Sequence, residues 1–279
     1  MLTTSLDGLW VLQAAAGIEQ LCPELGLRPL LPRLDTAERA MQHPVAQELI
    51  DIGALDADGQ VNTMIREWMT VIARRDVALM VSIGAPAPDG GFGTRVSLCR
   101  FAQWWVTLER HGDQVRLSPA GVAHDESSAG DVVVGQIEKL CGVAQAAELR
   151  PVTLPTEELL ATVRDDKSLR QFLTDQRLDM EQRNLLMAAA DREQSSQANI
   201  VAIQAGAGPD EQARLAFGEC AVTIADTPSG RICIENVYSG GRRYQVVVPG
   251  ARKTIGEAVV KLIRRLPAGD DWYSYRRVV

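Results

Sequence analysis

The residue types that carry most acid–base and metal chemistry are scarce in this chain. Its 279 residues include three histidines, His43, His111 and His124. None has a second histidine at the spacing typical of a zinc site. His124 begins the segment HDESS, whose carboxylates could bind a cation, but this composition is more typical of a solvated loop. The histidines therefore predict neither a metal centre nor a general base.

The five cysteines favour buried structural thiols over disulfides. They are odd in number, widely spaced and form no CxxC pair, which is typical of a protein from a reducing compartment such as the cytoplasm. Cys233 lies two residues from Arg231, and a neighbouring cation can lower the pKa of a thiol. No histidine is near it in the sequence, so a structural thiol is the favoured interpretation. The cysteines are Cys22, Cys99, Cys141, Cys220 and Cys233.

The common enzyme motifs are missing from the sequence. It contains no GxSxG nucleophile elbow, no HExxH pair and no GxxxxGK[ST] phosphate loop. The glycine-rich stretches GGFG (90–93) and GAGP (206–209) fit loops better than a dinucleotide-binding turn. Acid–base sites can still be assembled from distant residues. An enzyme or sensor with a small-molecule cleft between two halves of the chain therefore stays the alternative, and we expect no catalysis and no cofactor.

Charge and hydropathy exclude two further classes of partner. The net charge is −7, and basic residues occur in short pairs rather than stripes, which argues against nucleic acid or an anionic membrane. The apolar stretch 9–18, LWVLQAAAGI, lacks the preceding basic residues of a secretory signal. The sequence has no apolar run of about eighteen residues, so no membrane insertion is expected.

The most informative strand is 104–110, WWVTLER. Successive side chains on a strand point to opposite faces. Trp104, Val106 and Leu108 therefore share one face, which fits an ordinary core, whereas Trp105, Thr107 and Glu109 share a mixed face. A half-polar face with an aromatic anchor is a plausible protein-binding surface. The alternative is that helices from the middle of the chain pack over Trp105.

The order of expected elements repeats along the chain. Residues 2–13 have the pattern of a strand, and helices are expected over 35–52, with Asp35 as its N-cap, and 61–75, with Met64 on its buried face. Each half then shows a strand, a hairpin, a further strand and a helix, the helices being 130–143 and 254–266. Three helices within 156–190 predict a small bundle. We therefore expect one domain built from two pseudo-two-fold related halves, about 1–155 and 156–279.

Three stretches resemble the EspG family of type VII (ESX) secretion chaperones, and the resemblance covers essentially the whole chain. They are residues 2–40, which begin LTTSLDGLWVLQ, residues 100–112, RFAQWWVTLERHG, and residues 242–279, which begin RRYQVVVPG. In this last stretch, Pro249-Gly250 precedes the helix 254–266 and the sequence LPAGDDW (266–272). Within the family, the chain is most similar to the member associated with the second ESX system.

The resemblance implies a fold and a function. EspG proteins have an α+β fold with a central, mostly antiparallel sheet. They are cytosolic, are not known as enzymes, and bind the hydrophobic helical tip of the PPE protein in PE–PPE heterodimers, which keeps the pair soluble for secretion. The partner lies against the sheet and the helical bundle.

The family's partner site can be transferred to this chain only by the face of the sheet and of the bundle on which it lies, not by matched motif residues. The resemblance then implies a site of six residues. The loop 85–94 could also reach the partner, and the edge strands leave a homodimer possible. The six residues are Trp105, Thr107 and Glu109 on the sheet, and Leu159, Phe172 and Leu173 in the bundle.

Overall fold

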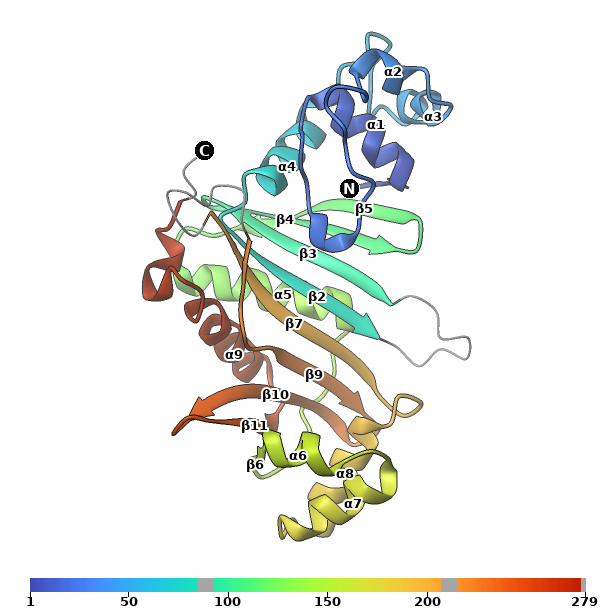
Figure 1. The fold of residues 1–279 in the computed structure, drawn as a ribbon. Coiled ribbons are helices and arrows are strands. Elements are labelled where there is room, and N and C mark those ends of the chain that lie inside the picture. The colour runs from blue at the N-terminus through green and yellow to red at the C-terminus, as the bar shows by residue number, and fades with distance from the viewer. Residues whose placement is uncertain (85–92, 207–214, 277–279) are drawn as a thin grey trace.

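A single eleven-stranded sheet organises the molecule (Figure 1). The computed structural model describes residues 1–84, 93–206 and 215–276. Every pairing between its named strands is antiparallel. The strands are β1 Leu2–Ser5, β2 Val77–Gly84, β3 Thr94–Phe101, β4 Trp104–His111, β5 Gln114–Val122, β6 Val152–Pro155, β7 Ser196–Ala205, β8 Leu215–Phe217, β9 Val222–Thr227, β10 Gly230–Ser239 and β11 Arg242–Pro249.

The order of the strands shows a pseudo-two-fold axis between β2 and β7. Along the sheet the order is β1-β5-β4-β3-β2-β7-β9-β10-β11-β6, so β3, β4, β5 and β1 on one side correspond to β9, β10, β11 and β6 on the other. The short strand β8 also pairs with β7. The α+β class, the antiparallel sheet and the two related halves are therefore confirmed. The division near residue 155 stays a prediction, and β6, which ends there, pairs with β11.

Helices cover the two faces of the sheet unequally. On one face, here called the covered face, α5 and α9 lie across the middle strands (Figure 1). On the other, the open face, α1–α4 occupy one end and the bundle α6–α8 occupies the other. The α-helices are α1 Leu6–Ala16, α2 Ala37–Met41, α3 Val45–Asp51, α4 Thr63–Ala73, α5 Glu126–Cys141, α6 Thr156–Thr162, α7 Asp166–Asp175, α8 Met180–Ala190 and α9 Arg252–Arg264, and the 3-10 helices are η1 Pro23–Leu25 and η2 Gly269–Tyr273.

Three apolar clusters hold these layers together. The first joins α1–α4 to the open face of β3–β5, the second joins α5 and α9 to the covered face, and the third joins the bundle to β6 and β9–β11. Burial of apolar surface contributes roughly 25 cal/mol for each Å² removed from water. Each helical layer is therefore fixed by its own part of the sheet.

The N-terminal expectations need correction at three points. The first strand ends at Ser5, because the Ser5 side chain accepts a hydrogen bond from the backbone N of Gly8 (3.0 Å) and begins α1. Thr36, not Asp35, caps the next helix. That helix breaks before Pro44 and resumes at Val45.

One helix face was also assigned wrongly. Met64 is 55% exposed, since the buried side of α4 carries Ile65 and Met69 instead. The helix expected from residue 130 begins earlier, because Asp125 forms a capping box at its start.

The C-terminal motif LPAGDDW is a structural anchor. Trp272 is completely buried, and its Nε1 donates a hydrogen bond to Glu126 Oε1 (2.7 Å). Arg100 of β3 donates from Nη1 to the Trp272 carbonyl (3.1 Å) and also to the Tyr273 carbonyl. Burial lowers the pKa of Arg100 to about 10. The motif therefore ties the end of the chain to α5 and to the sheet.

Candidate partner-binding surface

The predicted anchor Trp105 lies in the core. It is 1% exposed and belongs to the cluster beneath α5 and α9. The expectation of an open face around it is wrong, because α5 and α9, rather than the middle helices, cover that face. Thr107 is also fully buried, and its hydroxyl makes a 2.8 Å hydrogen bond with Ser118 Oγ. Neither side chain offers surface to a partner in this structure.

Glu109 remains partly accessible at the end of the same strand. Its side chain is 16% exposed and lies 3.8 Å from Arg116. Burial raises the pKa of the Glu109 carboxyl, and the charge of Arg116 opposes that effect. Its assignment as a partner contact stays a prediction.

Of the three predicted bundle residues, two are buried and one is partly accessible. Phe172 and Leu173 are 4% and 1% exposed and pack against the sheet. Leu159 is half-buried and lines a cavity of about 180 Å³ between the bundle and the sheet, and Leu173 contributes to the same wall. We call this cavity the bundle recess. It is lined by Leu154, Leu159, Leu169, Leu173, Leu186, Ala189, Ala190, Gln197, Thr223, Ala225, Ile234, Gln245 and Val247.

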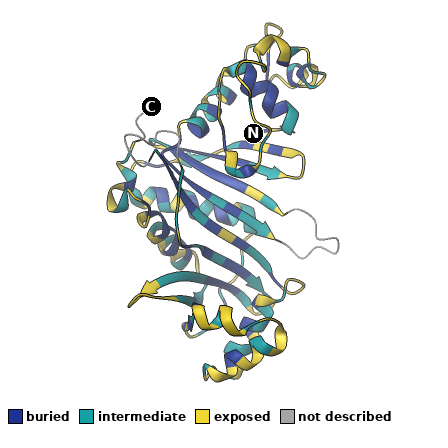
Figure 2. Cartoon of the chain, in the orientation of Figure 1, coloured by how far each residue is buried: buried dark blue, intermediate teal, exposed yellow. Residues whose placement is uncertain are grey.

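A strip of half-exposed residues extends from the recess across the open face. On β2 and β7, Met80 pairs with Val201 and Ser82 pairs with Asn199, and Asn199 pairs in turn with Thr223 of β9. Of these five residues Asn199 is exposed and the others are half-buried. Figure 2 shows half-buried and exposed segments on the strands in the middle of the sheet. The Thr223 hydroxyl donates to Asn199 Oδ1 (2.7 Å). Within the described residues, no helix lies over this strip (Figure 1).

The strip and the recess form one continuous surface. The cross-strand row Ser82, Asn199, Thr223, Ile234 and Val247 runs from β2 to β11 without a break. Thr223 belongs to both the strip and the recess wall. The row is polar over the strip, at Ser82, Asn199 and Thr223, and becomes apolar at the recess, at Ile234 and Val247. An apolar seat beside a polar margin is typical of a protein-binding patch.

The sequence reasoning missed this strip. The available signal is short: over 197–200, polar Gln197 and Asn199 alternate with apolar Ala198 and Ile200, which places the two polar side chains on one face. The prediction for loop 85–94 lies mostly outside the described residues, since 85–92 are not described.

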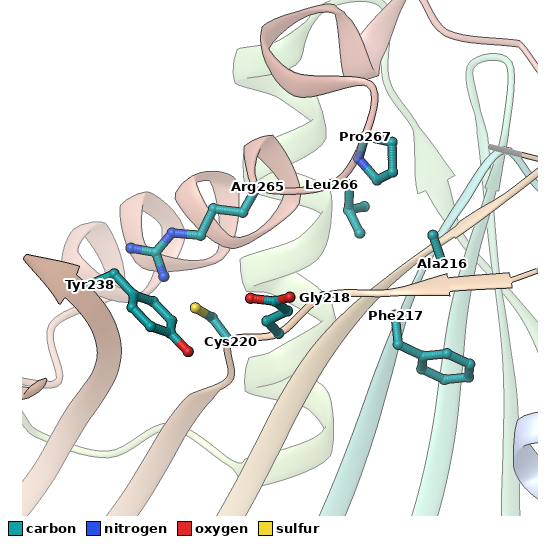
Figure 3. A pocket seen from close by; sticks show the side chains of 9 residues that line it. Ala216, Phe217, Gly218, Cys220, Tyr238, Arg265, Leu266 and Pro267 are labelled. Atoms are coloured by element: carbon teal, nitrogen blue, oxygen red, sulfur yellow. The ribbon is translucent and has the colours of Figure 1, made fainter. Parts of the chain in front are cut away.

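A second hollow lies where β8 and β10 spread apart (Figure 3). It encloses about 520 Å³, and we call it the notch. Phe217 and Tyr238 are 53% and 54% exposed on its two sides. Arg265, at the end of α9, donates to the Asn236 carbonyl (2.6 Å). The notch is lined by Ala216, Phe217, Gly218, Glu219, Cys220, Tyr238, Arg265, Leu266 and Pro267.

The titratable groups of the described residues form no cluster typical of catalysis. Burial raises the pKa of Cys233 to about 12, so this thiol stays protonated at neutral pH. No group of three histidine, cysteine or acidic side chains that could hold a metal ion occurs within 1–84, 93–206 and 215–276. Across the same ranges, every helix is too short or too polar to cross a bilayer.

Comparison with known proteins identifies the family. The model of the EspG family matches residues 5–261. The chain belongs to the EspG family. It is 62% identical over 279 residues to the ESX-2 secretion-associated protein EspG2 of Mycobacterium tuberculosis, with all of both chains covered. The expected similarity to the EspG member of the second ESX system is therefore confirmed.

More distant EspG proteins share the fold. The ESX-5 secretion-associated protein EspG5 of Mycobacterium marinum is 26% identical, with 99% of this chain and 97% of the relative covered. A solved structure of Mycobacterium tuberculosis EspG5, described as a type VII secretion system chaperone in complex with a PE25–PPE41 dimer, superposes with a TM-score of 0.75 at 20% identity. That match covers 96% of this chain and 98% of the other. At this identity it supports the fold.

Proposed function

We propose that this chain is a cytoplasmic, non-catalytic chaperone that binds the helical tip of a PPE protein in a PE–PPE heterodimer. The observation that carries the proposal is the continuous surface formed by the strip and the bundle recess. The solved EspG5 complex with PE25–PPE41 supports a partner of this class. Binding would cover the apolar tip and keep the heterodimer soluble until secretion.

The recess suits an apolar side chain from such a tip. A cavity of roughly 150 Å³ holds a benzene-sized ring in a protein core, and the recess encloses about 180 Å³ between leucines and small residues. Gln197 and Gln245 at its wall can hydrogen-bond to the backbone at the end of a helix. A helix or helical hairpin would lie along the strip, with its apolar end in the recess.

The alternative of a small-molecule enzyme has less support. Such a site needs convergent carboxylates or a perturbed histidine in a polar cleft. Among the described residues that line the notch, Glu219 is the one carboxylate, and the described recess wall is apolar apart from two glutamines and a threonine. These linings favour recognition of an apolar protein surface.

The direct test is co-expression with a PE–PPE pair encoded in the same gene neighbourhood, followed by size-exclusion chromatography. We expect the three proteins to elute as one complex. Changing the apolar residues of the PPE tip to polar ones should separate the chaperone from an intact PE–PPE pair. Separate elution from every soluble cognate pair would contradict the proposal.

A further inference from the structure

Two cysteines that are far apart in the sequence meet in the core. Cys22 Sγ lies 3.6 Å from Cys99 Sγ, and both residues are fully buried. Cys22 directly precedes η1, whereas Cys99 lies in β3 with its side chain toward the open face. The contact therefore joins the N-terminal helical layer to the sheet.

The surroundings of the pair are unusually polar for a core. Ser97 Oγ lies 3.3 Å from Cys99 Sγ and donates to Glu24 Oε1 (2.9 Å). Arg75 donates to Glu24 Oε2 (3.1 Å) and to the Leu21 carbonyl (3.1 Å). The side chains of Arg75 and Glu24 are 5% and 2% exposed, so this ion pair is buried beside the thiols.

The two thiols are chemically unequal. Burial opposes ionisation of both and raises the pKa of Cys22. At Cys99 burial is the largest single effect and would raise the pKa. The hydrogen bond with Cys22, the charge of Arg75 and the hydrogen bond with Ser97 together outweigh it, so the pKa of Cys99 is lowered. Cys99 is therefore the sulfur better able to act as the nucleophile, and Cys22 is placed to resolve its oxidised form.

We propose that Cys22 and Cys99 form an oxidisable dithiol that closes to a disulfide between the N-terminal layer and β3. The sulfurs must approach by about 1.6 Å to reach the length of an S–S bond. Cys22 lies in the segment that connects α1 to η1, outside any helix or strand. A small movement of this segment can therefore supply the approach.

Hydrogen peroxide is an oxidant that balances the reaction. The Cys99 thiolate attacks one peroxide oxygen and breaks the O–O bond, which gives a Cys99 sulfenic acid and, after protonation of the leaving hydroxide, one water. Cys22 Sγ then attacks the sulfenic sulfur and forms the S–S bond as the second water leaves. Two thiols lose two electrons, and one peroxide becomes two waters.

Closure would constrain the chain between residues 22 and 99. That loop contains α2, α3, α4 and β2, and β2 carries Met80 and Ser82 of the strip. A cross-link over a loop of this length restricts the unfolded chain, so the oxidised form should unfold at a higher temperature. The bond would thus stiffen one end of the open face.

The test uses the full chain, reduced and then treated with hydrogen peroxide. Remaining thiols are blocked with N-ethylmaleimide in denaturant, and peptides are mapped by mass spectrometry without reduction. We expect a linked peptide pair containing Cys22 and Cys99, and a raised unfolding temperature that dithiothreitol reverses. Cys220→Ser, which changes another buried cysteine, should keep the link, whereas Cys22→Ser should leave a Cys99 sulfenic acid that dimedone traps.

Two outcomes on the unmodified sequence would overturn the proposal. One is recovery of Cys22 and Cys99 as separate maleimide adducts after peroxide treatment that oxidises a small-molecule dithiol completely. The other is separate oxidation of both cysteines to sulfinic acids without a linked peptide. Neither result depends on whether the serine variants fold, or on binding of a PE–PPE pair.

Discussion

At the scale of single residues, the two adjacent tryptophans show how far strand alternation can be used. It correctly predicts that Trp104 and Trp105 point to opposite faces, and their exposed fractions are 50% and 1%. It cannot predict which face is covered, because α5 and α9 come from segments distant in the sequence. The same limit explains why four of the six predicted contact residues are core residues.

Replacement of Trp105 by alanine should therefore destabilise the fold. We expect Trp105→Ala to lower the free energy of unfolding by about 3–5 kcal/mol, since it removes a large buried side chain. Urea denaturation followed by circular dichroism measures the change. Trp104→Ala is the matched control and should cost less than about 1 kcal/mol. Equal stability of the two variants would place Trp105 at the surface and revive it as a partner contact.

The cap of α7 gives a prediction about pH. Asp165 accepts hydrogen bonds from the backbone N (2.8 Å) and Oγ (2.7 Å) of Ser168, and these bonds lower the pKa of Asp165. A carboxylate with a lowered pKa in the folded chain stabilises it above the ordinary value, near 3.9, and loses this effect as the pH falls through the lower folded value.

Asp165→Asn retains a capping oxygen but cannot titrate. We therefore expect the wild-type chain to have the higher urea midpoint at neutral pH, with a difference that shrinks as the pH falls from the ordinary aspartate value through the lower folded one. Other carboxylates titrate equally in both proteins, so the difference isolates Asp165. A difference that stays constant with pH would show that the carboxylate charge does not stabilise the cap.

At the scale of elements, the sequence predicts most helices and strands but fewer of their ends and faces. The strands over 78–84, 95–102 and 197–206 can be predicted because each is a short, apolar-rich run that includes β-branched residues. The helix is broken by Pro44, which has no side-chain cap, and the early start of α5 depends on the capping box of Asp125, which the spacing of apolar residues does not show. The strip was missed because it is assembled from β2, β7 and β9, which are far apart in the chain.

The β9–β10 turn contains a glycine that the structure requires. Gly230 has φ +114°, and an added Cβ would lie 2.8 Å from Ala147 Cα. We expect Gly230→Ala to lower the free energy of unfolding by about 2–5 kcal/mol, from backbone strain together with the steric clash.

Gly112 in the β4–β5 turn is the matched control, because it has φ +57° and no atom within 4 Å of an added Cβ. Gly112→Ala should cost about 1 kcal/mol. Thermal unfolding of both variants compares them directly. Equal losses would mean that the segment at Ala147 moves aside and that the turn tolerates a side chain.

At the scale of the whole molecule, the symmetric sheet carries helices across the middle of one face and only at the ends of the other (Figure 1). The middle of the open face is consequently the place where a partner could meet the sheet and the bundle together. The net charge of −7 and the apolar recess favour a protein partner over an anionic polymer. The central claim is that the strip is that contact surface.

The measurement that tests this claim most directly is binding of a cognate PE–PPE pair to Asn199→Arg, compared with Thr153→Arg, by isothermal titration calorimetry. Both sites are exposed strand positions, but Asn199 lies on the strip, whereas Thr153 lies on the edge strand β6 between the buried Val152 and Leu154. With unchanged thermal midpoints, we predict at least about tenfold weaker binding for Asn199→Arg, or 1.4 kcal/mol, and wild-type affinity for Thr153→Arg. Wild-type affinity for Asn199→Arg would contradict the account and place the partner elsewhere.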